Sequence, residues 1–148
     1  MIEKHVRDFL RDVAAIRNRV DQGASLPGIY AGNIPQAHYG EAIVLQAVDA
    51  DHSYHLGGEV ADRESVLQIT TYGENAARAY SLMELVRNRL SGYAGLMGDS
   101  DETRVKTCII LNDVGAGLSE PLDASDRWVH SYTVDYTIIH TTDVPTLT

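Results

Sequence analysis

Asp49, Asp51, His52 and His55 form the group of residues in this chain best suited to chemistry. Aspartate and histidine side chains at short spacing are ligands of divalent cations. Their spacing matches none of the strong zinc motifs, and the polar segment predicts a loop instead of a helix that would place both histidines on one face. We interpret it as the solvated tip of a hairpin. A small metal-dependent protein that uses Asp49–His55 is the alternative.

Two glycine-containing triplets resemble fragments of catalytic motifs. Gly98-Asp99-Ser100 is similar to part of a serine-hydrolase motif, but the acidic pair that follows, Asp101-Glu102, would repel a developing oxyanion. Gly115-Ala116-Gly117 lacks the lysine and the following helix of a phosphate-binding loop. Both triplets are therefore interpreted as turns.

A third polar group recurs every three residues, at Glu120, Asp123 and Asp126. This spacing does not fit the calcium-loop pattern, so a solvated acidic loop is the main interpretation and a weak cation site the alternative. Taken together, these groups predict no catalytic, cofactor or metal site, and a protein that is not an enzyme.

The composition is acidic. The 148 residues include 21 Asp and Glu against 12 Lys and Arg, a net charge of −9. Such a chain is repelled by phosphate backbones, which argues against tight binding of nucleic acid. The single cysteine, Cys108, excludes a disulfide within the chain and fits a reducing compartment.

The length favours one domain, residues 1–148, with a polar tail over 141–148 that is flexible or ordered by a partner. The first residues, Met1–His5, carry charge where a signal peptide would need an apolar core. No apolar run approaches the roughly 18 residues of a membrane span. We therefore expect the protein to be made in the cytoplasm and to be used there or in something assembled there.

Two segments have the apolar spacing of amphipathic helices. The first runs from Ile2 to Val20, and the second from about Glu74 to Leu90. Five segments predict strands: 29–31, 42–48, 65–72, 105–111 and 128–140. Segment 112–126 is rich in Gly and Asp and predicts a connection. The order α-β-β-β-α-β-β favours an α+β two-layer sandwich, a mainly antiparallel sheet with both helices on one face.

The last predicted strand alternates between two faces. One face is much more apolar and includes Trp128, His130, Tyr132, Val134 and Tyr136. Aromatic residues in this pattern indicate either a packed sheet surface or an edge that meets a partner, and both interpretations stay open here.

The whole pattern resembles a family. An N-terminal helix leads into Leu26–Pro35, a strand and a polar tip with Gly57-Gly58 follow, and the strand Ser65–Tyr72 passes through Gly73 directly into the helix Glu74–Leu90. The chain then ends in a long strand. In this arrangement it is similar to the tail-completion or tail-terminator proteins of long-tailed bacteriophages, which join head to tail. The likeness covers nearly the whole chain, although its motifs are loose and the segments 49–58 and 116–125 match no fixed family sequence.

The resemblance implies a structural protein of the virion neck. Members of that family form a ring, commonly a hexamer, that ends the tail tube and joins it to the head, and they use no cofactor. The implied partners are further copies of the chain, the tail tube protein and a head-completion or connector protein, with DNA passing through without specific binding and no membrane contact. Another neck, head-completion or tube component is the alternative.

Two hypotheses about surfaces follow. Acidic loops that line the ring would keep DNA from adhering, because contacts between cations and phosphate are then absent. The candidates are Asp49, Asp51, Glu59, Asp99, Asp101, Glu102, Glu120 and Asp123. A closed ring also needs two different contact surfaces on each subunit. For these we expect the last strand, at Tyr132, Val134 and Tyr136, and the tip, at Tyr54 and Leu56.

Overall fold

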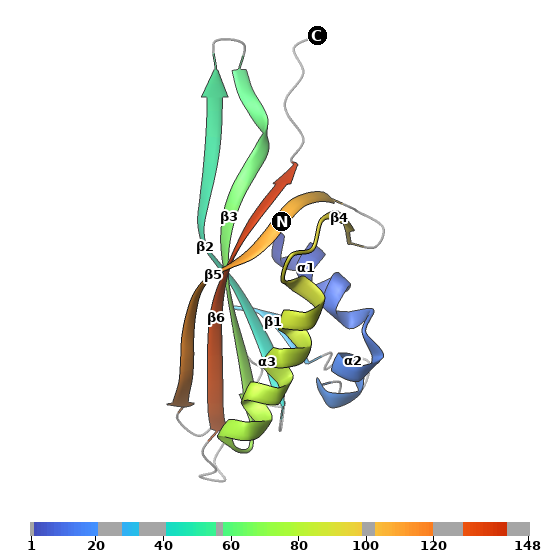
Figure 1. Ribbon diagram of the computed structural model, residues 1–148, viewed down its shortest axis with the longest axis vertical. Coiled ribbons are helices and arrows are strands. Elements are labelled where there is room, and N and C mark those ends of the chain that lie inside the picture. Colours follow the sequence, from blue (N-terminus) through green and yellow to red (C-terminus); the bar gives the residue numbers. More distant parts are fainter. Residues whose placement is uncertain are drawn as a thin grey trace.

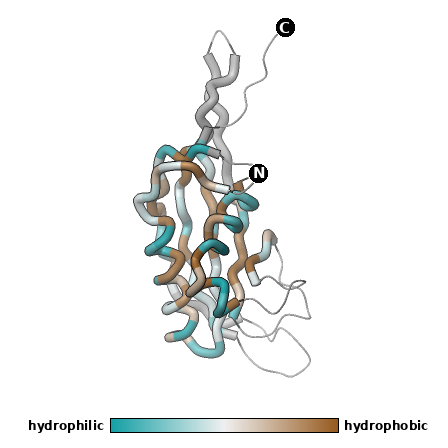
Figure 2. Tube along the Cα trace, turned by 90° about the vertical axis from the view of Figure 1, so that its right-hand side faces the viewer, coloured by the Kyte–Doolittle hydropathy of each residue, from teal (hydrophilic) through white to brown (hydrophobic). Residues whose placement is uncertain are grey.

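The computed structural model describes residues 2–20, 28–32, 41–55, 58–98, 103–119 and 129–141. A six-stranded sheet forms one layer, and the helices all lie against one of its faces (Figure 1). Figure 2 looks onto this helical side, where hydrophobic and hydrophilic segments alternate along the helices as amphipathic helices require. The predicted α+β class is confirmed.

The N-terminal segment forms two helices, where the sequence predicts one. Helix α1 spans Ile2–Arg11 and α2 spans Ala14–Val20. At the break, the Arg17 guanidinium donates to the carbonyl of Arg11 at 2.8 Å, which satisfies an acceptor at the end of α1. The break lets both pieces bury their apolar residues, with Leu10 and Ile16 each fully inaccessible.

Helix α3 spans Ala76–Leu90. The side chain of Asn75 caps it by accepting from the backbone N–H of Arg78 at 2.9 Å. Thr71, on the preceding strand, donates to the carbonyl of Ala79 at 2.7 Å and fixes the entry of the helix. The predicted second helix is therefore confirmed, with its start two residues later than expected. None of the helices in the described parts of the chain is long and apolar enough to cross a membrane.

The sheet has the order β1-β2-β3-β6-β5-β4. Its strands are β1 (Ile29–Ala31), β2 (Ala42–His55), β3 (Gly58–Gly73), β4 (Gly95–Met97), β5 (Thr103–Ser119) and β6 (Val129–Thr141). Every neighbouring pair is antiparallel except β1 with β2. The segment predicted as a polar tip is an extended hairpin, in which β2 and β3 run on well beyond the helices (Figure 1).

Two strand predictions are corrected. Strand β4 was not predicted, and β5 continues to Ser119 through the segment predicted as a connection. Gly and Asp are depleted in strands, which is why the local composition suggests a loop there. Long pairing with β6 overrides that preference, and β5 absorbs the unfavourable residues in bulges, with Gly115 at a φ of 90° beside one of them.

The helices and the sheet share one hydrophobic core. Leu67, Ile69 and Val134 from the sheet meet Leu82 and Met83 from α3, and all five are fully buried. The alternation predicted for the last strand is confirmed except at Thr137: Val134, Tyr136, Ile138 and His140 are buried and Ser131, Thr133 and Asp135 are partly accessible, but Thr137 on the polar face is buried as well. The predicted tail lies outside the described residues, except for Thr141 at the end of β6.

Candidate assembly surface

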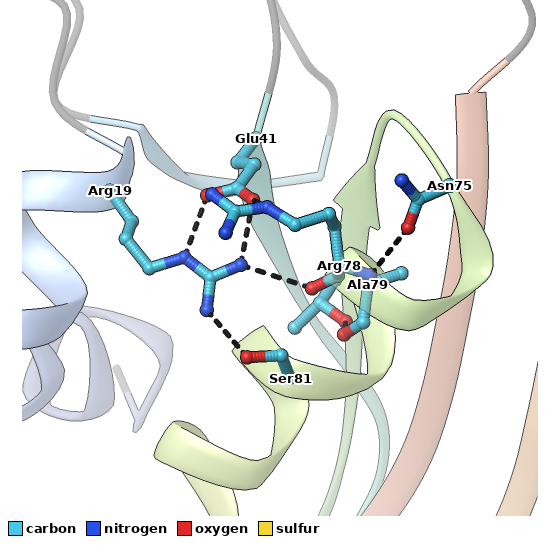
Figure 3. A network of polar contacts seen from close by, with 7 residues as sticks. Arg19, Glu41, Asn75, Arg78, Ala79 and Ser81 are labelled. Atoms are coloured by element: carbon cyan, nitrogen blue, oxygen red, sulfur yellow. Dashed lines mark hydrogen bonds and ion pairs between the residues drawn. The ribbon is translucent and has the colours of Figure 1, made fainter.

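A polar network holds the helical layer on the sheet (Figure 3). Glu41, at the start of β2, accepts from Arg19 of α2 at 2.6 and 2.8 Å and from Arg78 of α3 at 2.8 Å. Arg19 also donates to Ser81 at 3.0 Å. The carboxylate side chain is only 9 % exposed and both its oxygens are engaged by guanidinium groups. The network is thus suited to fixing three elements together.

A serine and a histidine meet within the sheet. Ser65 Oγ on β3 lies 2.9 Å from His140 Nε2 on β6. Their geometry is that of a nucleophile and a base, but the two residues are only 2 % and 5 % exposed. A substrate could not reach this oxygen, so the contact is best explained as a polar link between neighbouring strands.

The expectation that the last strand meets a partner is corrected. Strand β6 lies between β3 and β5 in the middle of the sheet, and α3 packs on its apolar face. Val134 and Tyr136 are therefore fully buried inside the subunit, and burial raises the pKa of the Tyr136 hydroxyl. Tyr132 is half-buried and stacks edge-to-face on Tyr80 of α3, with ring centroids 5.3 Å apart.

The structure tests none of the other predicted surface residues, because it describes neither their side chains nor, for most of them, their backbone. Tyr54 pairs with Glu59 in the backbone of that hairpin, and Asp49 and Asp51 also lie on β2, but the structure does not describe these side chains. Leu56 and the remaining acidic candidates, Asp99, Asp101, Glu102, Glu120 and Asp123, lie outside the described residues. Their roles stay predictions.

The same applies to metal binding by the Asp49–His55 segment. Among the residues with described side chains, no group of three or more His, Cys, Asp or Glu is placed to hold a metal ion. The side chains of the segment itself are outside that set. The triplet Gly98–Ser100 and the acidic group at 120, 123 and 126 are likewise outside or only partly within the described residues.

Among the described side chains, the most prominent apolar surface lies on β5, in a place that was not predicted from the sequence. Strand β4 covers β5 at residues 103–105, and the backbone N–H of Gly92 donates to the carbonyl of Cys108 at 2.7 Å; from Ile109 onward, within the described residues, β5 pairs with β6 alone. This free edge carries four exposed hydrophobic side chains, here called the β5 strip: Ile109 (50 % exposed), Ile110 (36 %), Leu111 (57 %) and Val114 (55 %).

The opposite side of the sheet has the same construction. Strand β1 covers β2 only at residues 43–45, and in the described part of the chain β2 then pairs only with β3. Val48 stands just beyond the covered part and is 51 % exposed. Each side of the sheet therefore ends in a long strand whose edge is mostly open.

Bulges coincide with three of the exposed apolar residues, Leu111, Val114 and Val48, whereas Ile109 and Ile110 have residues of β6 opposite them. The register of β5 shifts between Ile110 and Asn112 and between Asp113 and Gly115, which leaves Leu111 and Val114 without a residue opposite them. The shift between Ala47 and Asp49 does the same for Val48. One signal for the strip was present in the sequence, since three successive apolar residues, Ile109–Leu111, cannot all face one side of a strand.

An ion pair holds β5 against the helical layer beside the strip. Arg87 of α3 donates to Asp113 Oδ2 at 3.0 Å and to Glu84 Oε1 at 2.9 Å. Hydrogen bonding to the same Asp113 raises the pKa of the Tyr132 hydroxyl. The free edge of β5 is thus linked to α3 through Arg87 and Asp113.

Comparisons with known proteins place the fold. No protein-family profile and no curated protein sequence matches the chain. A solved structure described as the virion of a native gene transfer agent particle contains a chain of the same fold, with a TM-score of 0.63 and 16 % sequence identity. The likeness covers 94 % of this chain and 94 % of that one. Nearly the whole chain therefore shares its architecture with a component of that particle.

Proposed function

We propose that this chain is a structural protein of a phage-like virion, and that it forms the ring that ends the tail tube and joins it to the head. The observation that carries the proposal is the fold shared, over 94 % of both chains, with a chain of a gene transfer agent virion. The family resemblance of the sequence points to the same class of protein.

Two features of the described residues support an assembly role. The sheet has two open edges with exposed apolar residues, which a protein that acts alone normally protects. The polar pair with the geometry for catalysis, Ser65 and His140, is buried. Both features suit a subunit that works by contact with other proteins.

In this function the ring sits in the neck of the virion, after assembly in the host cytoplasm. It contacts the tail tube protein on one side and a head-completion or connector protein on the other. DNA passes through the lumen without specific binding, and the net charge of −9 favours such passage if the acidic side chains named above face inward.

Electron microscopy of the purified protein, alone and mixed with tail tubes, tests this function. We expect rings in the free sample and density at one end of each tube in the mixture. Binding along the whole length of the tube would indicate a tube component instead. Binding to heads but not to tubes would indicate a head-completion protein. Absence of both rings and binding would contradict a role in the virion.

A further inference from the structure

The two free edges lie on opposite sides of one sheet, separated by the full strand order β2-β3-β6-β5. Among the residues that the structure describes, each edge has no strand partner beyond its short covered part, and each exposes apolar side chains at its bulges, Val48 on β2 and Leu111 and Val114 on β5. Because the edges face away from each other, one copy of the chain cannot cover its own edges.

A second copy can cover them in two ways. A two-fold contact of β5 with β5 would leave both β2 edges open, with Val48 still exposed. A head-to-tail contact of β5 on one copy with β2 on the next covers one edge of each kind at every contact. Repeated with a rotation, such a contact closes into a ring. Two-fold contacts could cover both edges only if β2 also met β2 in a second, different interface, whereas the head-to-tail arrangement covers both edges with one kind of contact.

The size of the β5 strip suits an interface between copies. The four aliphatic side chains are 36–57 % exposed and, counted over both faces of the edge strand, present on the order of 300 Å² of apolar surface, which is comparable to the largest apolar patch of a typical monomer, a patch that is often functional. A standard interface buries about 800 Å² on each partner. The strip is thus large enough for the apolar centre of an interface, and the polar residues along both edges would form its rim.

We infer that the β5 strip docks on the β2 edge of a neighbouring copy, with Leu111 and Val114 near Val48, and that this contact repeats around the ring. The inference rests on the proposed function in that it names the contact by which the ring closes. It concerns contacts between copies and can be tested on purified protein, without tubes or heads.

Cysteine crosslinking tests which edges meet. In a Val48→Cys, Leu111→Cys double variant, a short bismaleimide should produce a ladder of dimers, trimers and larger species. An equal mixture of the two single variants should stop at dimers, because each such dimer uses up its only pair of cysteines. Each single variant alone should remain uncrosslinked. Cys108 is buried and provides the background, which is measured on the unaltered chain.

Charge placed on each edge gives an independent measurement. Leu111→Lys and Val48→Lys should each lower the oligomer fraction by at least about tenfold, because a buried interface then holds an unpaired charge. The matched control is Leu96→Lys on β4, where a leucine of similar exposure, 50 %, lies away from the strip. An equal mixture of the Leu111→Lys and Val48→Lys chains should form dimers, since each retains one intact edge.

Three results would overturn the inference. Crosslinking of Leu111→Cys with itself, together with normal assembly of Val48→Lys, would establish the two-fold contact. Rings that form normally in both lysine variants would place the interface elsewhere. An unaltered chain that stays monomeric up to its solubility limit would show that the edges do not meet. Crosslinked ladders without binding to tubes would support the contact and contradict only the proposed function.

Discussion

Arg87 on α3 and Asp113 on β5 form an ion pair with a separation of 3.0 Å, beside the bulge that exposes Val114. Their side chains are 23 % and 42 % exposed, so the pair is only partly shielded from water. It is the described side-chain link between the helical layer and the open part of β5. This modest ion pair adds to the hydrogen bond between Asp113 and Tyr132 and to the pairing of β5 with β6.

Replacing Asp113 with Ala should loosen this edge without unfolding the protein. An exposed ion pair contributes about 0–1 kcal/mol, so the free energy of unfolding in urea should fall by less than about 1 kcal/mol. Backbone amides of β5 should exchange hydrogen faster while those of β3 stay unchanged. The control is Glu84→Ala, which removes a different acidic partner of Arg87 but leaves β5 untouched. Equal exchange rates in the two variants would contradict this role of Asp113.

Glu41→Gln should lower the free energy of unfolding far more than Asp113→Ala does. The substitution leaves Arg19 and Arg78 close together without a compensating charge at a position that is only 9 % exposed. Removing one member of a buried charge network costs about 3–5 kcal/mol, and the partial exposure of Arg78 places the expected loss at the lower end. Urea unfolding measures it, with Glu84→Gln as the exposed counterpart. A loss below about 1 kcal/mol would show that the network is dispensable.

Gly28 and Gly32 form a matched pair for testing the turn before and after β1. Both have a positive φ, 81° and 95°, so alanine is strained at either position. A Cβ at Gly28 would overlap the backbone carbonyl of Val20, whereas at Gly32 nothing lies within 4 Å. Gly32→Ala should cost about 1–2 kcal/mol, and Gly28→Ala about 1–3 kcal/mol more. Thermal denaturation of the two variants gives the difference, and equal melting temperatures would refute the close approach to Val20.

Cys108 makes stability fall at alkaline pH. Burial raises the pKa of its thiol from 9.0 to about 12. Above pH 9 the unfolded chain releases this proton and the folded chain does not, so the contribution is complete below pH 9 and is lost as the pH rises toward 12. Between pH 8 and pH 10, the unaltered chain should lose about 1 kcal/mol more than a Cys108→Ala variant. Urea unfolding of both chains at the two pH values measures these free energies of unfolding. An equal loss between pH 8 and pH 10 in the two chains would exclude the thiol as the cause.

The acidic lumen predicted from the sequence is tested by reversing charge. Asp49→Lys with Asp51→Lys should give a ring that retains duplex DNA at low salt and releases it steeply as salt rises, because new phosphate contacts release counterions. Asp12→Lys with Glu74→Lys changes the net charge equally, at exposed positions on the helical side. If both variants retain DNA to the same extent, the prediction that Asp49 and Asp51 line the lumen is wrong.

The sequence alone determined the local elements and the faces they bury. The stripe of Leu82, Met83 and Val86 predicted α3, and the alternation through Val134 and Tyr136 predicted both β6 and its buried face. These predictions succeed because a period of 3.6 or 2 is set by the backbone geometry of each segment, independently of its neighbours. The α+β class followed from the order of the elements.

Only the tertiary structure decided which strands lie at the edges. Pairing of strands is non-local, so the alternation of β6 shows that one face is buried but not that β3 and β5 flank it. For the same reason the surface expected at Tyr136 is in the core, and the exposed surface is on β5 at Leu111 and Val114, where bulges in the pairing with β6 turn apolar residues outward. Bulges depend on the register between two strands, and no single segment encodes that register.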